Sequence, residues 1–157
     1  MATILIAGGS GLIGMRLSQL LLEKGYKVRH FSRQQKVGSP YSTFVWDVQK
    51  GTYDQAAFEN VTHVINLAGA GIADARWTEK RKELIINSRM DSTNLLKKGI
   101  LAHGKDVKAY LAGSAIGYYG NRADIVLQEE AGTSEGFLSE SVRIWDCLLY
   151  TSDAADE

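Results

Sequence analysis

The chain has 157 residues, 45% of them hydrophobic, and its 18 basic residues balance 18 acidic ones, so we expect one ordinary core and no nucleic-acid partner. No apolar run approaches the ~18 residues of a spanning helix, so we expect no membrane partner. The single cysteine, Cys147, excludes an internal disulfide framework and fits a reducing compartment, and we expect a cytoplasmic protein.

The first predicted element is a strand over Thr3–Ala7, which leads through a glycine-rich turn into an amphipathic helix. A direct turn from strand to helix favours a positive φ, and a missing Cβ lets a pyrophosphate approach the backbone amides. The free N–H groups and positive dipole end of the helix favour an anion. The predicted phosphate-binding residues are Gly8, Gly9, Ser10, Gly11, Leu12, Ile13 and Gly14. A tight turn without a ligand is the alternative.

The helix after this turn predicts a packed face at helical spacing, formed by Leu12, Ile13, Leu17, Leu20 and Leu21. A second strand follows over Tyr26–Phe31, and Arg33 stands where an NAD-binding protein would carry an acidic residue. A guanidinium can pair with a 2′-phosphate, so the sequence favours NADP over NAD. Arg33 could also be a solvated loop cation.

Two further strands are predicted over Thr43–Trp46 and Val61–Leu67. Asp47 follows the first of them, where its carboxylate could accept from an adenine amino group or cap the next turn. Small residues follow the second strand and keep the backbone close to a ligand at the carboxyl edge. Leu67, Ala68 and Gly69 are therefore predicted to contact the cofactor.

A long charged helical region is predicted over Ala75–His103, with Thr78 as a plausible N-cap. A fifth strand over Val107–Ala112 precedes a segment that carries one hydroxyl and two phenols, from Ser114, Tyr118 and Tyr119. Another helix begins at about residue 136. The alternation of strand and helix patterns predicts an α/β fold of the Rossmann type, with a doubly wound parallel sheet.

Four segments together resemble one family, and they cover residues 1 to about 146: Gly8–Gly14, Asn66–Gly69, Arg76–Thr78 with the helix to Thr93, and Ser114–Gly120. They are similar to the atypical extended short-chain dehydrogenases/reductases, the SDR39U1/YfcH-like epimerase family. The resemblance implies a bound dinucleotide, most simply NADPH, and an NAD(P)-dependent epimerase or oxidoreductase. Its substrate would be a small molecule of the carbonyl or sugar-nucleotide type.

The sequence departs from the catalytic pattern that the resemblance implies. The positions of the Tyr-x-x-x-Lys pair hold Phe137 and Ser141, and Arg89 replaces a helix asparagine that is common in the superfamily. Arg89 is carried over as a cofactor-binding residue. Ser114, Tyr118 and Tyr119 are the local candidates for proton handling, although they could merely shape the nicotinamide pocket. No metal ligand set is expected.

The last residues, 147–157, resemble the translation of a transposase-type sequencing adapter rather than a continuation of the family. We therefore expect residues 1–146 to form a partial NAD(P)-binding domain whose fold is incomplete at its C-terminal end. Two functions remain open. One is the NADP(H)-binding part of an epimerase or oxidoreductase, and the other is a non-catalytic dinucleotide-binding sensor or structural protein.

Overall fold

The computed structural model describes residues 1–35 and 38–150, and the chain divides into two compact units. The first unit contains residues 1–69 and 91–113, and the second contains residues 70–90 and the chain from 114 onward. Helix α2 (Glu79–His103) contributes to both, because its residues up to Met90 belong to the second unit and those from Asp91 to the first.

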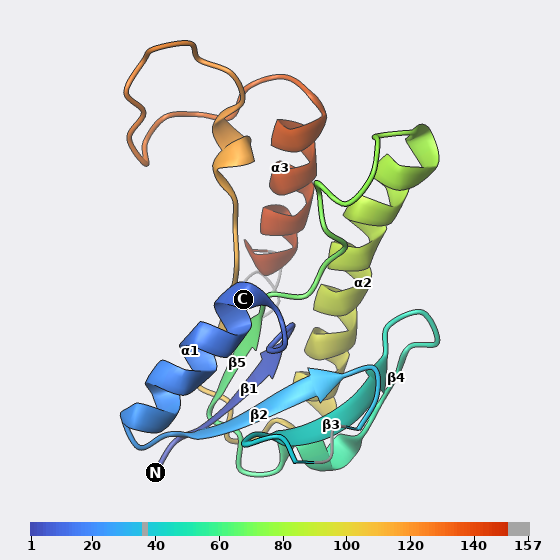
Figure 1. The fold of residues 1–157 in the computed structure, drawn as a ribbon, viewed down its shortest axis with the longest axis vertical. Helices are drawn as coiled ribbons and strands as arrows, with labels where there is room; N and C mark the ends of the chain where they lie inside the picture. Colours follow the sequence, from blue (N-terminus) through green and yellow to red (C-terminus); the bar gives the residue numbers. More distant parts are fainter. Residues whose placement is uncertain (36–37, 151–157) are drawn as a thin grey trace, which may run out of the picture. The chain divides into compact units, whose positions relative to one another are not determined.

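The first unit is built on a six-stranded sheet in the order β4-β3-β2-β1-β5-β6. Figure 1 labels the first five of these strands, β4 to β5. The bounds of its strands are β1 Thr3–Ala7, β2 Lys27–Ser32, β3 Ser42–Asp47, β4 Thr52–Tyr53, β5 His63–Asn66 and β6 Ala109–Ala112. All neighbouring pairs are parallel except β3 and β4, which form an antiparallel pair. The fold is therefore the expected α/β fold of the Rossmann type, with one short antiparallel edge.

Both faces of this sheet are covered, because successive side chains of a strand point to opposite faces. On one face, Ile4 and Ile6 of β1 form a buried cluster against which Leu17 and Leu21 of α1 (Leu12–Glu23) pack. On the other face the cluster includes residues of β1, β2, β3, β5, the 3₁₀ helix η1 (Gln55–Phe58) and the second half of α2.

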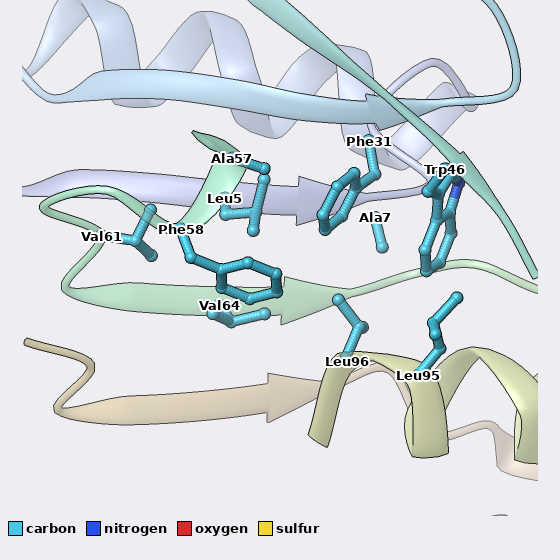
Figure 2. Packing of buried hydrophobic residues seen from close by; sticks show 10 residues of the cluster. All are labelled: Leu5, Ala7, Phe31, Trp46, Ala57, Phe58, Val61, Val64, Leu95 and Leu96. Atoms are coloured by element: carbon cyan, nitrogen blue, oxygen red, sulfur yellow. The ribbon is translucent and has the colours of Figure 1, made fainter. Parts of the chain in front are cut away.

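Figure 2 shows this second cluster at close range. The rings of Phe31 and Trp46 stack with their centroids 5.0 Å apart, and Phe58 meets Phe31 edge-on at 5.6 Å. Leu95 and Leu96 reach the strands from α2. The aromatic rings bring large apolar areas together, so this face is the main hydrophobic core of the unit.

The helix α1 packs differently from its sequence pattern. Leu12 and Ile13 are exposed, not part of the packed face, while the buried positions of α1 are Gly14 and Ser18. Small residues let the first turns of the helix lie close to the sheet, and this close approach leaves Leu12 and Ile13 outside.

Several element boundaries also differ from the sequence prediction. Strands β5 and β6 are shorter than expected, and the connection from β3 to β5 contains β4 and η1, neither of which was predicted. Helix α2 begins at Glu79 rather than Ala75, because the Oγ1 of Thr78 accepts the N–H of Arg81 and so caps the helix there, as predicted for Thr78. The indole N–H of Trp77 donates to the Ile72 carbonyl, which keeps the preceding residues in a loop.

The second unit contains the loop before α2, the first half of α2, the 3₁₀ helix η2 (Ile116–Tyr119) and α3 (Phe137–Tyr150) (Figure 1). Within this unit, the hydroxyl of the buried Ser139 donates to the Tyr118 carbonyl at 2.6 Å and accepts the N–H of Ser134 at 3.0 Å. Gly117 lies against Leu138, where a Cβ would be 3.3 Å from the Leu138 Cβ. These contacts fix η2 against α3.

The segment expected to derive from an adapter falls partly outside the described residues. Helix α3 continues to Tyr150, whereas residues 151–157 lie outside the part of the chain that the structure describes. The origin of this segment therefore stays a prediction. Among the described residues, no helix has both the length and the apolar character needed to cross a membrane.

Candidate functional site

The glycine-rich turn between β1 and α1 is tightly packed. Gly8 has φ +79°, and a Cβ there would lie 2.6 Å from the carbonyl carbon of Leu67. A Cβ on Gly14 would lie 2.5 Å from the Gly8 carbonyl oxygen. Because real Cβ atoms do not approach other atoms so closely, glycine is required at both positions for this turn to form.

The helix α1 begins directly after this turn. Gly11 is the N-cap residue, and no side chain forms a capping hydrogen bond to the first turn of the helix. The side chains of Leu12 and Ile13, which follow, are 91% and 68% exposed. Backbone N–H groups and the dipole make this helix end suitable for an anion, and the two apolar side chains offer surface that a bound molecule could cover.

The segment after β5 is held against the turn by Asn66. Its Oδ1 accepts the N–H of Ala68 at 3.0 Å, and its Nδ2 lies within hydrogen-bonding distance of Ser92, Thr93 and Tyr110, at 3.3, 3.2 and 3.1 Å. Burial raises the pKa of the Tyr110 phenol, against the opposing effect of its hydrogen bonds to Thr93 and Asn66. Leu67 and Ala68 were predicted from the sequence, whereas this anchor was not, because its local signal is only a polar residue at the end of a buried strand.

Arg33 follows β2 and Asp47 is the last residue of β3, so both lie at the carboxyl ends of these strands. Arg33 is exposed and comes directly after Ser32, the last residue of β2. The Asp47 carboxylate accepts the backbone N–H of Lys50 at 3.1 Å, and this hydrogen bond is the main cause that lowers the pKa of Asp47. Capping of the β3–β4 turn, one of the two alternatives for Asp47, is therefore what the geometry shows. Its role toward adenine stays a prediction.

In the second unit, Ser114 and the two phenols lie on the segment that precedes and forms η2. The Ser114 hydroxyl donates to Oδ2 of Asp146 at 2.9 Å. Burial raises the pKa of the Asp146 carboxyl group, while the hydrogen bond from Ser114 acts in the opposite direction. The rings of Tyr118 and Tyr119 are perpendicular, with centroids 5.4 Å apart. The structure thus gives the serine a carboxylate partner that the sequence analysis did not assign.

Arg89 is a well-packed side chain of the second unit. Its guanidinium donates to the carbonyl oxygens of Ala70 and Ile85, each at 3.0 Å, and lies over the Trp145 ring at 4.6 Å. Burial lowers the pKa of Arg89 from its ordinary value. The residue therefore supports the loop before α2, in addition to its predicted role at the cofactor.

The positions of the expected Tyr-x-x-x-Lys pair lie in the first turns of α3. The Phe137 ring contacts Trp77 edge-on at 5.3 Å, and the Ser141 hydroxyl donates to the Phe137 carbonyl within the helix. Neither side chain offers a proton relay of the usual kind, because a phenyl ring has no acidic group and the Ser141 hydroxyl is used for a helical backbone carbonyl.

The predicted site residues thus fall into two groups. The first unit holds the turn Gly8–Gly14 with the adjacent Leu67, Ala68 and Gly69, and also Arg33 and Asp47. The second unit holds Arg89, Ser114, Tyr118 and Tyr119. Within the described residues there is no cluster of three or more histidine, cysteine or acidic side chains that could hold a metal ion.

Known proteins of similar sequence and fold match almost the whole length of this chain. The "Epimerase family protein Mb2239" of Mycobacterium bovis is 33% identical over 145 residues, which are 92% of this chain and 47% of that protein. The human "epimerase family protein SDR39U1", solved with NADPH, superposes with a TM-score of 0.76 at 28% identity, over 93% of this chain and 48% of that chain. A nucleoside-diphosphate sugar epimerase from Corynebacterium glutamicum superposes with a TM-score of 0.77 at 27% identity, over 99% of this chain and 32% of that one.

The chain spans about half the length of the curated relatives it matches, 46% to 48% for the first few. Its residues 4–141 match the model described as "NAD dependent epimerase/dehydratase family". Together with the parallel sheet and the glycine-rich turn, this match shows that the chain belongs to the NAD-dependent epimerase/dehydratase family.

Proposed function

We propose that the first unit binds a nicotinamide dinucleotide, with its diphosphate at the amino terminus of α1. The observation that carries this proposal is the turn at Gly8, whose positive φ and close contact with the Leu67 carbonyl carbon leave room only for glycine. The N–H groups of the first helical turn then face a bound phosphate, and Leu12 and Ile13 cover its flanks. Leu67, Ala68 and Gly69 line the adjacent backbone edge.

NADP is the proposed cofactor in preference to NAD. The related human protein SDR39U1 was solved with NADPH, whereas the UDP-glucose 4-epimerase of Bifidobacterium longum, which shares this fold, was solved with NAD⁺ and UDP. In this chain the residue after β2 is Arg33 and no carboxylate stands beside it, so a 2′-phosphate gains a cationic partner.

Titration of the 157-residue chain with NADPH and NADH, followed by nicotinamide fluorescence, tests both parts of this proposal. We expect saturable binding of both cofactors, with NADPH tighter by about tenfold, the contribution of one charge-assisted hydrogen bond. If neither NADPH nor NADH binds, the proposal of a dinucleotide site is overturned. Equal or tighter binding of NADH overturns the preference for NADP.

For the complete protein we propose an epimerase or oxidoreductase that acts on a small molecule of the carbonyl or sugar-nucleotide type. The related Corynebacterium glutamicum protein is described as a nucleoside-diphosphate sugar epimerase. A nicotinamide cofactor supplies hydride transfer. The Ser114 hydroxyl and the phenols of Tyr118 and Tyr119 are the proposed groups for holding or moving the substrate proton. A reducing, cytoplasmic location fits such an activity.

A second function, dinucleotide binding without hydride chemistry, is favoured by Phe137. This residue occupies the expected tyrosine position, packs on Trp77 and cannot relay a proton. The two functions are separated by two incubations of the complete protein, one with carbonyl compounds and NADPH deuterated at C4, and one with sugar nucleotides and NADP⁺, because an epimerase takes its hydride from the sugar. Deuterium transfer to a carbonyl compound or conversion of a sugar nucleotide to its epimer supports the enzyme, while cofactor binding without either reaction supports the sensor.

A further inference from the structure

The glycine-rich turn lies directly on a buried histidine of β2. A Cβ built on Gly9 would meet three atoms of the His30 imidazole first, the nearest at 2.5 Å. The φ of Gly9 is not in the positive region, so its backbone conformation is open to alanine. The side chain of His30 is thus the group that excludes a methyl group at this position of the turn.

The same imidazole is linked to the first turns of α1. Its Nε2 lies 2.7 Å from the Ser18 hydroxyl, and that hydroxyl donates to the Gly14 carbonyl at 2.6 Å. Because the Ser18 proton is used for this carbonyl, Nε2–H donates to the Ser18 oxygen. The ring also stacks on Tyr41, with centroids 4.5 Å apart and planes 26° from parallel. His30 and Ser18 are both buried.

We propose that His30 is a positioning residue for the dinucleotide, which acts through the turn without touching the ligand; this inference rests on the function proposed above. The imidazole fixes two points of the anion-binding segment at once, the Cα of Gly9 by contact and the carbonyl of Gly14 through Ser18. The N–H groups that face the diphosphate lie between these points. Their orientation therefore depends on a hydrogen-bond donor in β2.

Three variants of the 157-residue chain test this inference, with NADPH as the probe. His30→Gln keeps an N–H donor near the Nε2 position, whereas His30→Leu removes the donor but keeps apolar volume. His63→Gln is the matched control, because His63 is the first residue of β5 and so lies at the end of that strand away from the glycine-rich turn. We expect His30→Leu to shift the amide NMR signals of Gly9, Gly11 and Gly14 without ligand and to weaken NADPH binding by about tenfold. His30→Gln restores affinity to within about threefold of the wild type, and His63→Gln changes neither readout.

The inference is overturned if His30→Leu and His63→Gln have the same amide NMR signals in the glycine-rich turn and the same affinity for NADPH. If the wild-type chain does not bind NADPH, the proposed function fails, while the amide signals recorded without ligand still decide the role of His30.

A second measurement tests the contact itself. Gly9→Ala is expected to lower the midpoint of chemical denaturation in the wild-type background and to have a clearly smaller effect in the His30→Ala background, where the methyl group has room. Equal effects in both backgrounds contradict the contact and with it the positioning role.

Discussion

Gly8 and Gly25 share a backbone conformation but not their surroundings. Their φ angles are +79° and +82°, yet a Cβ on Gly8 would lie 2.6 Å from a backbone atom, whereas nothing lies within 4 Å of a Cβ on Gly25. We expect Gly25→Ala to lower the free energy of unfolding by about 1 kcal/mol through conformational strain alone. Gly8→Ala is expected to lower it by about 3 kcal/mol or more, because overpacking adds to the strain. Urea denaturation measures both, and equal losses would contradict the tight packing of Gly8.

Arg33 is the residue on which the choice of cofactor depends. Arg33→Ala is expected to weaken NADPH binding by about tenfold or more and to leave NADH binding nearly unchanged, because only NADPH carries the 2′-phosphate. Lys105→Ala, which removes a cation before the start of β6, is the control and should affect neither cofactor. If Arg33→Ala still binds NADPH more tightly than NADH, Arg33 is a solvated loop cation and does not determine the choice of cofactor.

Tyr110 predicts a pH dependence of stability. Burial raises the pKa of its phenol in the folded chain above the ordinary value of 10.0, so the unfolded chain loses this proton first as the pH rises. The stabilising contribution is complete below pH 10 and is lost as the pH rises through the pKa of the folded state. We expect the unfolding free energy of the wild type to fall more steeply above pH 10 than that of Tyr110→Phe. Parallel curves for the two proteins would contradict this assignment.

At the residue scale, the glycine-rich turn could be predicted from the sequence, whereas the residues that support it could not. The glycine spacing predicted the turn because φ and close approach restrict it to one amino acid. The roles of Asn66 and His30 depend on which strands are neighbours, since Asn66 meets Tyr110 and His30 meets Gly9 only in the folded sheet. Such contacts between segments distant in sequence leave no local pattern.

The start of α2 depends on a single capping residue. The Oγ1 of Thr78 accepts the N–H of Arg81 at 3.3 Å, which satisfies one of the unpaired donors at the helix end. Thr78→Ala is expected to lower the free energy of unfolding by about 1 kcal/mol, while Thr78→Ser keeps the hydroxyl and remains within about 0.5 kcal/mol of the wild type. Thermal denaturation followed by circular dichroism compares the three proteins. Equal stability of the alanine and serine variants would contradict the capping role of the Thr78 hydroxyl.

At the element scale, strands with continuous apolar runs were predicted from the sequence, and short irregular elements were not. β1 is buried at all five positions, so its pattern is clear. Strand β4 has two residues and η1 has four, too few for any periodicity. Moreover, η1 is held by Arg29 of β2, whose guanidinium donates to the carbonyl oxygens of Ala56, Ala57 and Glu59. This tertiary contact decides the local structure.

At the scale of the whole molecule, the chain spans about half the length of the curated relatives it matches, so the proposed activity is tested separately for the 157-residue chain. We expect the 157-residue chain to bind NADPH weakly, not to oxidise it with any carbonyl compound and not to convert any sugar nucleotide to its epimer. Absorbance at the nicotinamide band measures the first reaction, with an established carbonyl reductase as positive control, and chromatography of the sugar nucleotides measures the second, with an established epimerase. Detectable turnover by the chain alone would place a complete reaction centre within these residues.

The two edges of the sheet differ in their tendency to recruit other chains. At one edge, β4 offers only two residues and runs antiparallel to β3, so it is a poor template for intermolecular strand pairing. At the other edge, β6 is a parallel strand of four residues that carries Leu111, 49% exposed. A lysine or proline placed on β6, rather than on β4, is therefore the substitution that would oppose pairing of this sheet with another chain.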